Sequence, residues 1–172
     1  MYQARAIWTD KDRFLGEAGS GHAVVMDAGE PKTASTPMEM VLIALCGCTL
    51  SDVVSILRKR REPFTTLEVR AEAERATDYP KAYTSIKLIY RVGGKVSREG
   101  LERAVQFVGK KYCSVSAMLQ KTAKIEVVIA GWSKAAGAVT IHEENESGAG
   151  SHDFPGFAAM ESGERTGFGS AE

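Results

Sequence analysis

The sequence predicts an α+β domain followed by a C-terminal tail. Three short runs with strand-like alternation open the chain, a long apolar helical segment follows, and further strand and helix signals come after it. A length of 172 residues suits one domain, and 44% apolar with 26% charged residues is ordinary for a globular protein with a core. We place the domain at residues 1–130 and the tail at residues 131–172.

The first elements are three strands and a helix. Strands are predicted at residues 3–9, 13–17 and 22–27, because turn signals (DKD and GSG) separate these runs. Thr36, Pro37 and Glu39 then form the pattern of a capping box with proline at the first helical position. We expect this helix to run to about residue 60 and to be central and buried, because its first half is apolar all round. Its one glycine, Gly47, suggests close packing there.

The second half of the domain is predicted to hold two strands, two helices and a last strand. Residues 67–74 and 85–92 alternate apolar with charged or polar side chains, as in an antiparallel pair that is covered on one face. Ser97 can cap a helix over residues 98–111, and a short helix starts at Cys113 or Ser114. A strand at residues 124–130 ends the domain.

Charge and composition exclude several classes of protein. After Gly131 there are seven acids and two bases, which leaves 15 acids, 20 bases and a net charge of +5 in the first 130 residues. This charge is too sparse for a nucleic-acid footprint. The tail is rich in Gly, Glu and Ser without periodicity, so we expect it to be flexible. We expect no signal peptide, because the N-terminal residues carry charges where one needs an apolar stretch, and the apolar run at residues 40–48 is about half a membrane span. We therefore predict a cytoplasmic protein without membrane or nucleic-acid partners.

The three cysteines are the candidate reactive groups. Cys46 and Cys48 lie two positions apart on the predicted helix, so they point about 200° apart and cannot pair with each other comfortably. A zinc site is not expected, because Cys113 is far along the chain and the histidines lack ligand spacing. We therefore predict no metal.

Each thiol has a functional and a structural interpretation. Cys46 shares its helix face with apolar residues, so inert packing is favoured for it. Cys48 lies where another face turns from apolar to polar, as at the floor of a half-open pocket. Cys113 follows Lys110 and Lys111 and precedes a helix, which would favour a thiolate, although it could equally fill a helix corner.

Three other polar residues are weaker candidates. Glu39 could act in the site, although its place in the capping box explains it fully. Asp52 lies one turn after Cys48 and could contact a substrate, or could simply face solvent. His22 in GSGHAVV could likewise bind a substrate, or be a histidine at the edge of a loop.

The element order, together with the segments STPMEMVLIALCGCTLSDVVSIL and KYCSVSAML, resembles the OsmC/Ohr family of osmotically inducible and organic hydroperoxide resistance proteins. The likeness covers about residues 1–130 and is greatest to an OsmC-like branch. It implies an intertwined homodimer in which antiparallel sheets wrap around long central helices, with a pocket at the interface. It also implies that Cys48, eleven residues after Pro37, is the peroxidatic cysteine and that Cys113 resolves it.

The implied reaction is the reduction of an organic hydroperoxide. Cys48 would be oxidised to a sulfenic acid, Cys113 would form a disulfide with it, and an external dithiol such as a protein-bound lipoyl group would reduce the disulfide. No cofactor is expected. Two positions differ from the peroxidases, because Met38 stands where they carry a glutamate and GSGHAVV lacks their loop arginine. Two alternatives therefore stay open, namely a module that binds a small apolar ligand and a redox sensor.

Overall fold

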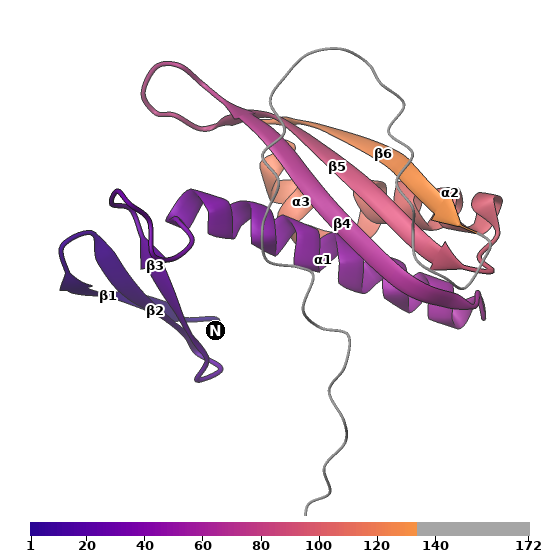
Figure 1. The fold of residues 1–172 in the computed structure, drawn as a ribbon, viewed down its shortest axis with the longest axis horizontal. Coiled ribbons are helices and arrows are strands. Elements are labelled where there is room, and N and C mark those ends of the chain that lie inside the picture. Colours follow the sequence, from indigo (N-terminus) through magenta and orange to yellow (C-terminus); the bar gives the residue numbers. More distant parts are fainter. Residues whose placement is uncertain (134–172) are drawn as a thin grey trace, which may run out of the picture. The chain divides into compact units, whose positions relative to one another are not determined.

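The computed structural model describes residues 1–133 of the chain (Figure 1). The predicted tail, apart from its first three residues, lies outside the described residues, and so do His142 and His152. The predicted order of elements is confirmed. The elements are β1 (Ala4–Asp10), β2 (Arg13–Ala18), β3 (Ala23–Asp27), α1 (Pro37–Lys59), β4 (Phe64–Arg75), β5 (Tyr83–Gly94), α2 (Arg98–Phe107), the π-helical turn η1 (Val108–Tyr112), α3 (Ser114–Leu119) and β6 (Lys124–Ser133).

The first three strands form an antiparallel sheet in the order β1-β2-β3. None of its apolar residues belongs to the hydrophobic core of the described chain. Several of them are exposed instead, and Trp8 has 66% of its surface accessible. A three-stranded sheet needs a covered apolar face to be stable, and within the described residues this sheet has none.

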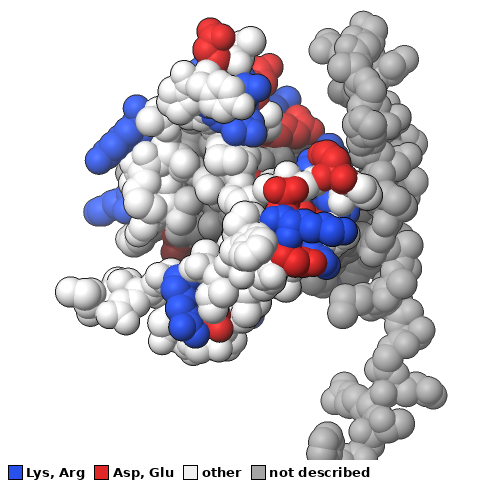
Figure 2. Space-filling model, turned by 90° about the vertical axis from the view of Figure 1, so that its left-hand side faces the viewer, with Lys and Arg blue, Asp and Glu red and all other residues white. Residues whose placement is uncertain are grey.

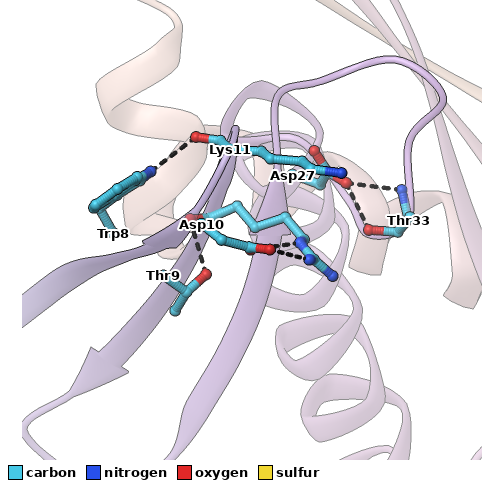
Figure 3. A network of polar contacts seen from close by, with 7 residues as sticks. Trp8, Thr9, Asp10, Lys11, Asp27 and Thr33 are labelled. Carbon is cyan, nitrogen blue, oxygen red and sulfur yellow. Dashed lines mark hydrogen bonds and ion pairs between the residues drawn. The ribbon is translucent and has the colours of Figure 1, made fainter.

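Asp27 organises the connection from β3 to α1 (Figure 3). Its buried carboxylate accepts hydrogen bonds from the Gly29 backbone N–H at 2.8 Å and from the Thr33 backbone N–H at 3.0 Å and hydroxyl at 2.6 Å. These bonds hold the pKa of Asp27 below its usual value, the Thr33 hydroxyl having the largest effect. The loop therefore has a defined shape although it contains no regular structure.

Helix α1 begins as predicted. The Thr36 hydroxyl accepts from the Glu39 backbone N–H at 3.2 Å, and the Glu39 carboxylate accepts from the Thr36 backbone N–H at 2.7 Å. The expectation that α1 is buried all round is wrong for the chain on its own. One stripe is buried, consisting of Leu45, Thr49, Val53 and Leu57. Ile43 is 52% exposed, and a side chain at Gly47 would meet nothing within 4 Å.

The length and apolarity of α1 also bear on the membrane prediction. Residues 37–59 form a helix that is long and apolar enough to cross a bilayer, and 22% of its most apolar 18-residue window is buried within the chain. The prediction from residues 40–48 underestimated the apolar length of α1, because apolar residues continue beyond that run on the same helix. A core helix of a soluble protein has the same composition, so this observation alone does not indicate a membrane protein.

The second sheet has the order β4-β5-β6, and Figure 1 shows the three α-helices on one face of it. β4 and β5 are antiparallel, as predicted, and alternate residues of β5 form the centre of the core: Ile86, Leu88, Tyr90 and Val92. β6 is parallel to β5, so the expectation of antiparallel sheets does not extend to this pair. The connection through α2, η1 and α3 returns the chain to the end of the sheet where β5 begins, which makes a parallel strand possible.

The predicted helix over residues 98–111 is shorter than expected. It ends at Phe107 and continues as the π-helical turn η1, which leads directly to Cys113. Its start is fixed by Ser97, whose hydroxyl accepts from the Gly100 backbone N–H at 3.1 Å and donates to the Glu62 carboxylate at 2.7 Å. Glu62 follows α1 in sequence, so this pair ties the end of α1 to the start of α2.

Candidate functional site

Cys48 and Cys113 meet in the described structure. Cys48 lies in the middle of α1 and is half-buried, whereas Cys113 lies between η1 and α3 and is only 3% exposed. The side chains of Cys48 and Cys113 are hydrogen-bonded to each other. All three cysteines are free thiols. The fold thus brings together two thiols that lie far apart along the chain.

The two thiols have different environments. Burial and, after it, the hydrogen bond with Cys48 raise the pKa of Cys113 to about 12, although the Ser116 backbone N–H, 3.3 Å from the sulfur, opposes these effects. The expectation that neighbouring lysines favour a thiolate at Cys113 is therefore wrong. The Lys111 ammonium lies over the Phe107 ring, 5.8 Å from its centroid. Cys113 keeps its proton at neutral pH, and Cys48 is the more accessible thiol.

Beneath the thiols lies a pair of buried hydroxyl groups that the sequence analysis missed. Tyr90 on β5 is 1% exposed, and its hydroxyl is hydrogen-bonded to Thr49 on the buried stripe of α1. Burial, with smaller contributions from nearby Cys113 and Cys46, raises the pKa of Tyr90 to about 12, although the hydrogen bond with Thr49 partly offsets these effects. The Thr49 hydroxyl donates to the Leu45 carbonyl at 3.0 Å. The sequence did contain a signal for this pair, because Tyr90 lies at an inward position of an apolar strand and Thr49 lies on the apolar face of a helix.

Cys46 lies apart from the pair. It is half-buried against the core, as expected from its apolar face. Burial raises its pKa, and a hydrogen bond with the backbone of Ala71 on β4 partly offsets this. Cys46 therefore has its polar partner in the sheet rather than in the other two thiols.

Known proteins with similar sequences identify the family of this chain. The family model described as OsmC-like protein matches residues 29–128. Protein YhfA of Escherichia coli K12 is 43% identical over 124 residues, which are 72% of this chain and 92% of YhfA. The chain belongs to the OsmC-like family. The OsmC-like match includes both cysteines of the thiol pair, and the resemblance inferred from the sequence motifs is confirmed.

Solved structures show that the OsmC-like fold is shared more widely. A hypothetical protein from Aquifex aeolicus is 26% identical, with a TM-score of 0.70 over 77% of this chain and 97% of that one. An organic hydroperoxide resistance protein, OsmC, from Legionella pneumophila has a TM-score of 0.59 at 13% identity, over 75% of this chain and 96% of that one. The second likeness concerns the fold alone. This OsmC-like protein is thus a structural relative of organic hydroperoxide resistance proteins.

Of the three weaker candidates in this OsmC-like protein, Glu39 and His22 lie away from the thiol pair, and Asp52 lies beside it. Glu39 is exposed and is held in the capping box, which lowers its pKa mainly through the Thr36 backbone N–H. It lies nine residues before Cys48, about 13 Å along the helix axis. His22 is exposed in the turn between β2 and β3, with its Nδ1 3.1 Å from the Ser20 hydroxyl. Asp52 is half-buried one turn after Cys48 and interacts electrostatically with Tyr90.

No metal centre is evident in the part of the chain that the structure describes. Residues 1–133 contain no group of three or more His, Cys, Asp or Glu side chains that could hold an ion. What the site of this OsmC-like protein offers chemically is one accessible thiol, one buried proton-bearing thiol, and a hydroxyl pair behind them.

Replacing Cys113 with alanine should reduce the loss of stability at alkaline pH. The pKa of Cys113 is raised from 9.0 to about 12 in the folded chain, so the unfolded chain releases this proton first. The stability that this thiol contributes is fully present below about pH 9 and is lost as the pH rises through about 12. Within this window the wild type should lose about 1.4 kcal/mol per pH unit more than the variant, as measured by urea unfolding. Equal slopes would show that Cys113 is not held in its neutral form.

Proposed function

We propose that this chain is a thiol-dependent reductase of organic hydroperoxides, with Cys48 as the attacking thiol and Cys113 as the resolving thiol. The observation that carries the proposal is the side-chain hydrogen bond between Cys48 and Cys113. The family and its structural relatives among hydroperoxide resistance proteins support the substrate class.

The proposed cycle has three balanced steps. The Cys48 thiolate attacks the distal oxygen of a hydroperoxide and the O–O bond breaks, which gives a sulfenic acid and an alkoxide. The alkoxide takes a proton from water and leaves as the alcohol. The Cys113 sulfur then attacks the Cys48 sulfur, and the leaving hydroxide takes the Cys113 proton to form water. An external dithiol reduces the resulting disulfide and becomes a disulfide itself. This cycle needs a reductant and no resident cofactor. A reducing cytoplasm, where three free thiols persist, is the proposed compartment.

Peptide mapping after one oxidation tests the proposal. Reduced protein is treated with one equivalent of cumene hydroperoxide, quenched with an alkylating agent and digested for mass spectrometry. We expect a rapid Cys48–Cys113 disulfide, with Cys46 recovered as an alkylated thiol that serves as the internal control. Recovery of all three thiols in reduced form, while a known peroxidase reacts under the same conditions, would contradict the proposed activity.

We also propose that the chain acts as a homodimer, with a second copy covering its exposed apolar surfaces. These surfaces are the N-terminal sheet, with Ile7, Trp8, Val24 and Val25 exposed, and the face of α1 that includes Ile43 and Gly47. Figure 2 shows a broad uncharged area on the side that it displays, with charged residues gathered around it. An uncovered area of this kind is unusual in a monomer, and a two-fold interface would bury both copies of it.

A charged side chain on the exposed face of α1 should separate the subunits. Gly47→Glu adds a carboxylate where this chain leaves open space, so the folded monomer can accept it, whereas an apolar helix contact with a second copy cannot. We expect the wild type to be dimeric and Gly47→Glu to be monomeric in light scattering after size exclusion. Gly109→Glu, at a glycine in η1 with equal free space, is the control and should stay dimeric. A monomeric wild type would overturn the proposal.

A further inference from the structure

A groove between α1 and α2 has the composition of a binding site, and it lies away from the thiol pair. It has a volume of about 440 Å³ and is lined by Ile56, Arg60, Arg103, Ala104, Gln106 and Phe107. Ligand pockets in proteins commonly have volumes of 300–1,000 Å³, so the groove can hold a small organic molecule. Ile56 lies eight residues after Cys48, about 12 Å along α1, so the groove is distinct from the proposed reaction site.

The floor and the far wall of the groove are apolar. Ile56 and Ala104 supply the floor from the two helices, and Ala104 is fully packed into the core beneath it. Phe107 forms the wall and is 47% exposed. Its ring packs against the Tyr112 ring, with ring centroids 5.0 Å apart. A flat apolar body can therefore stack on Phe107 over the floor.

The rim of the groove is cationic. Arg60 caps the C-terminal end of α1, and Arg103 reaches the same groove from α2. Arg103 is paired with Glu99, but both side chains are largely exposed, at 63% and 73%, and an exposed pair of this kind contributes little. An incoming carboxylate can therefore compete for the Arg103 guanidinium while Arg60 binds it from the other helix.

We propose that this groove binds a small amphipathic organic anion, with its carboxylate between Arg60 and Arg103 and its apolar body against Ile56 and Phe107. Charge complementarity selects the anion, and the aromatic wall favours a planar body. The proposal does not depend on the thiol chemistry, because no cysteine is among the residues that line the groove.

Binding of 2-naphthoate tests the proposal, with neutral 2-naphthamide as the matched probe. Titrations of the full chain are followed by calorimetry and by ¹H–¹⁵N NMR. We expect naphthoate to bind at least ten times more tightly than naphthamide and to shift the amide signals of residues 56–60 and 103–107. The double variant Arg60→Gln/Arg103→Gln should lose at least tenfold in affinity for naphthoate. Both side chains are exposed, so thermal unfolding should show that the variant stays folded.

The matched control is Arg98→Gln. Arg98 is an exposed arginine on the same helix, is paired with Glu102 at 2.9 Å, and does not line the groove. Its substitution should leave the affinity for naphthoate unchanged. Equal affinities for the acid and the amide, an equal loss in Arg98→Gln, or shifts that map to the thiol pair instead would each overturn the proposal.

Discussion

Replacing Cys48 with serine should abolish hydroperoxide consumption. Serine keeps the size of the side chain, but its hydroxyl stays protonated where a thiolate must attack, so the initial rate with cumene hydroperoxide should fall by at least about a hundredfold. Because Cys48 is half-buried and its partner is the neighbouring thiol, the variant should fold normally. The measurement is the loss of hydroperoxide in the presence of excess dithiothreitol.

The other two cysteines provide the controls. Cys46→Ser should keep the initial rate within about twofold, because its polar partner is the backbone of Ala71 rather than Cys48. Cys113→Ser should keep the first turnover and let the Cys48 sulfenic acid accumulate, which dimedone would trap. Slow consumption at the same rate by the wild type and Cys48→Ser would rule out the enzyme and leave the ligand-binding module as the better interpretation.

Replacing Leu57 with alanine should destabilise the chain by about 3 kcal/mol. Leu57 is fully buried in the core between α1 and the second sheet, and truncation of such a leucine leaves a cavity that the packed neighbours cannot fill. Urea unfolding should show a lower midpoint with little change in slope. A loss below about 1 kcal/mol would mean that this part of the core relaxes freely.

Ile43→Ala is the informative comparison on the same helix. Ile43 is 52% exposed within the chain, so its truncation should cost less than about 1 kcal/mol if the chain unfolds as a monomer. If a second copy covers α1, the cost should approach that of Leu57→Ala, and the unfolding midpoint should rise with protein concentration. Comparing the stability losses of Leu57→Ala and Ile43→Ala thus shows whether α1 is buried only within one chain or also against a second copy.

Local signals explain which elements the sequence predicts well. The start of α1 depends on Thr36 and Glu39, which lie within one turn of each other, so their pattern is readable directly. The same holds for the alternation of β4 and β5. The end of α2 is different, because a π-helical turn replaces the last helical turn after Phe107, and the one glycine in that turn, Gly109, does not by itself end a helix.

The site depends on contacts between distant residues, which limits what the sequence predicts. The family resemblance pairs Cys48 with Cys113, but the 65 positions of chain that separate them fix no distance. Cys113 stays protonated because burial raises its pKa, whereas the adjacent lysines in the sequence suggest a thiolate. Tyr90 looked like any inward residue of a strand, because only the packing of β5 on α1 shows that its hydroxyl meets Thr49.

The contact between the two thiols also links redox state to chain entropy. A bond between Cys48 and Cys113 would close a loop of 65 residues, and in the chain-entropy view this removes enough unfolded conformations to stabilise the fold by about 4 kcal/mol. Oxidation by substrate would therefore leave the protein in its more tightly constrained form, and each reduction would release that constraint. A reductant that breaks this disulfide would therefore also remove the constraint on the chain, because the same covalent bond determines both the redox state and the rigidity of the domain.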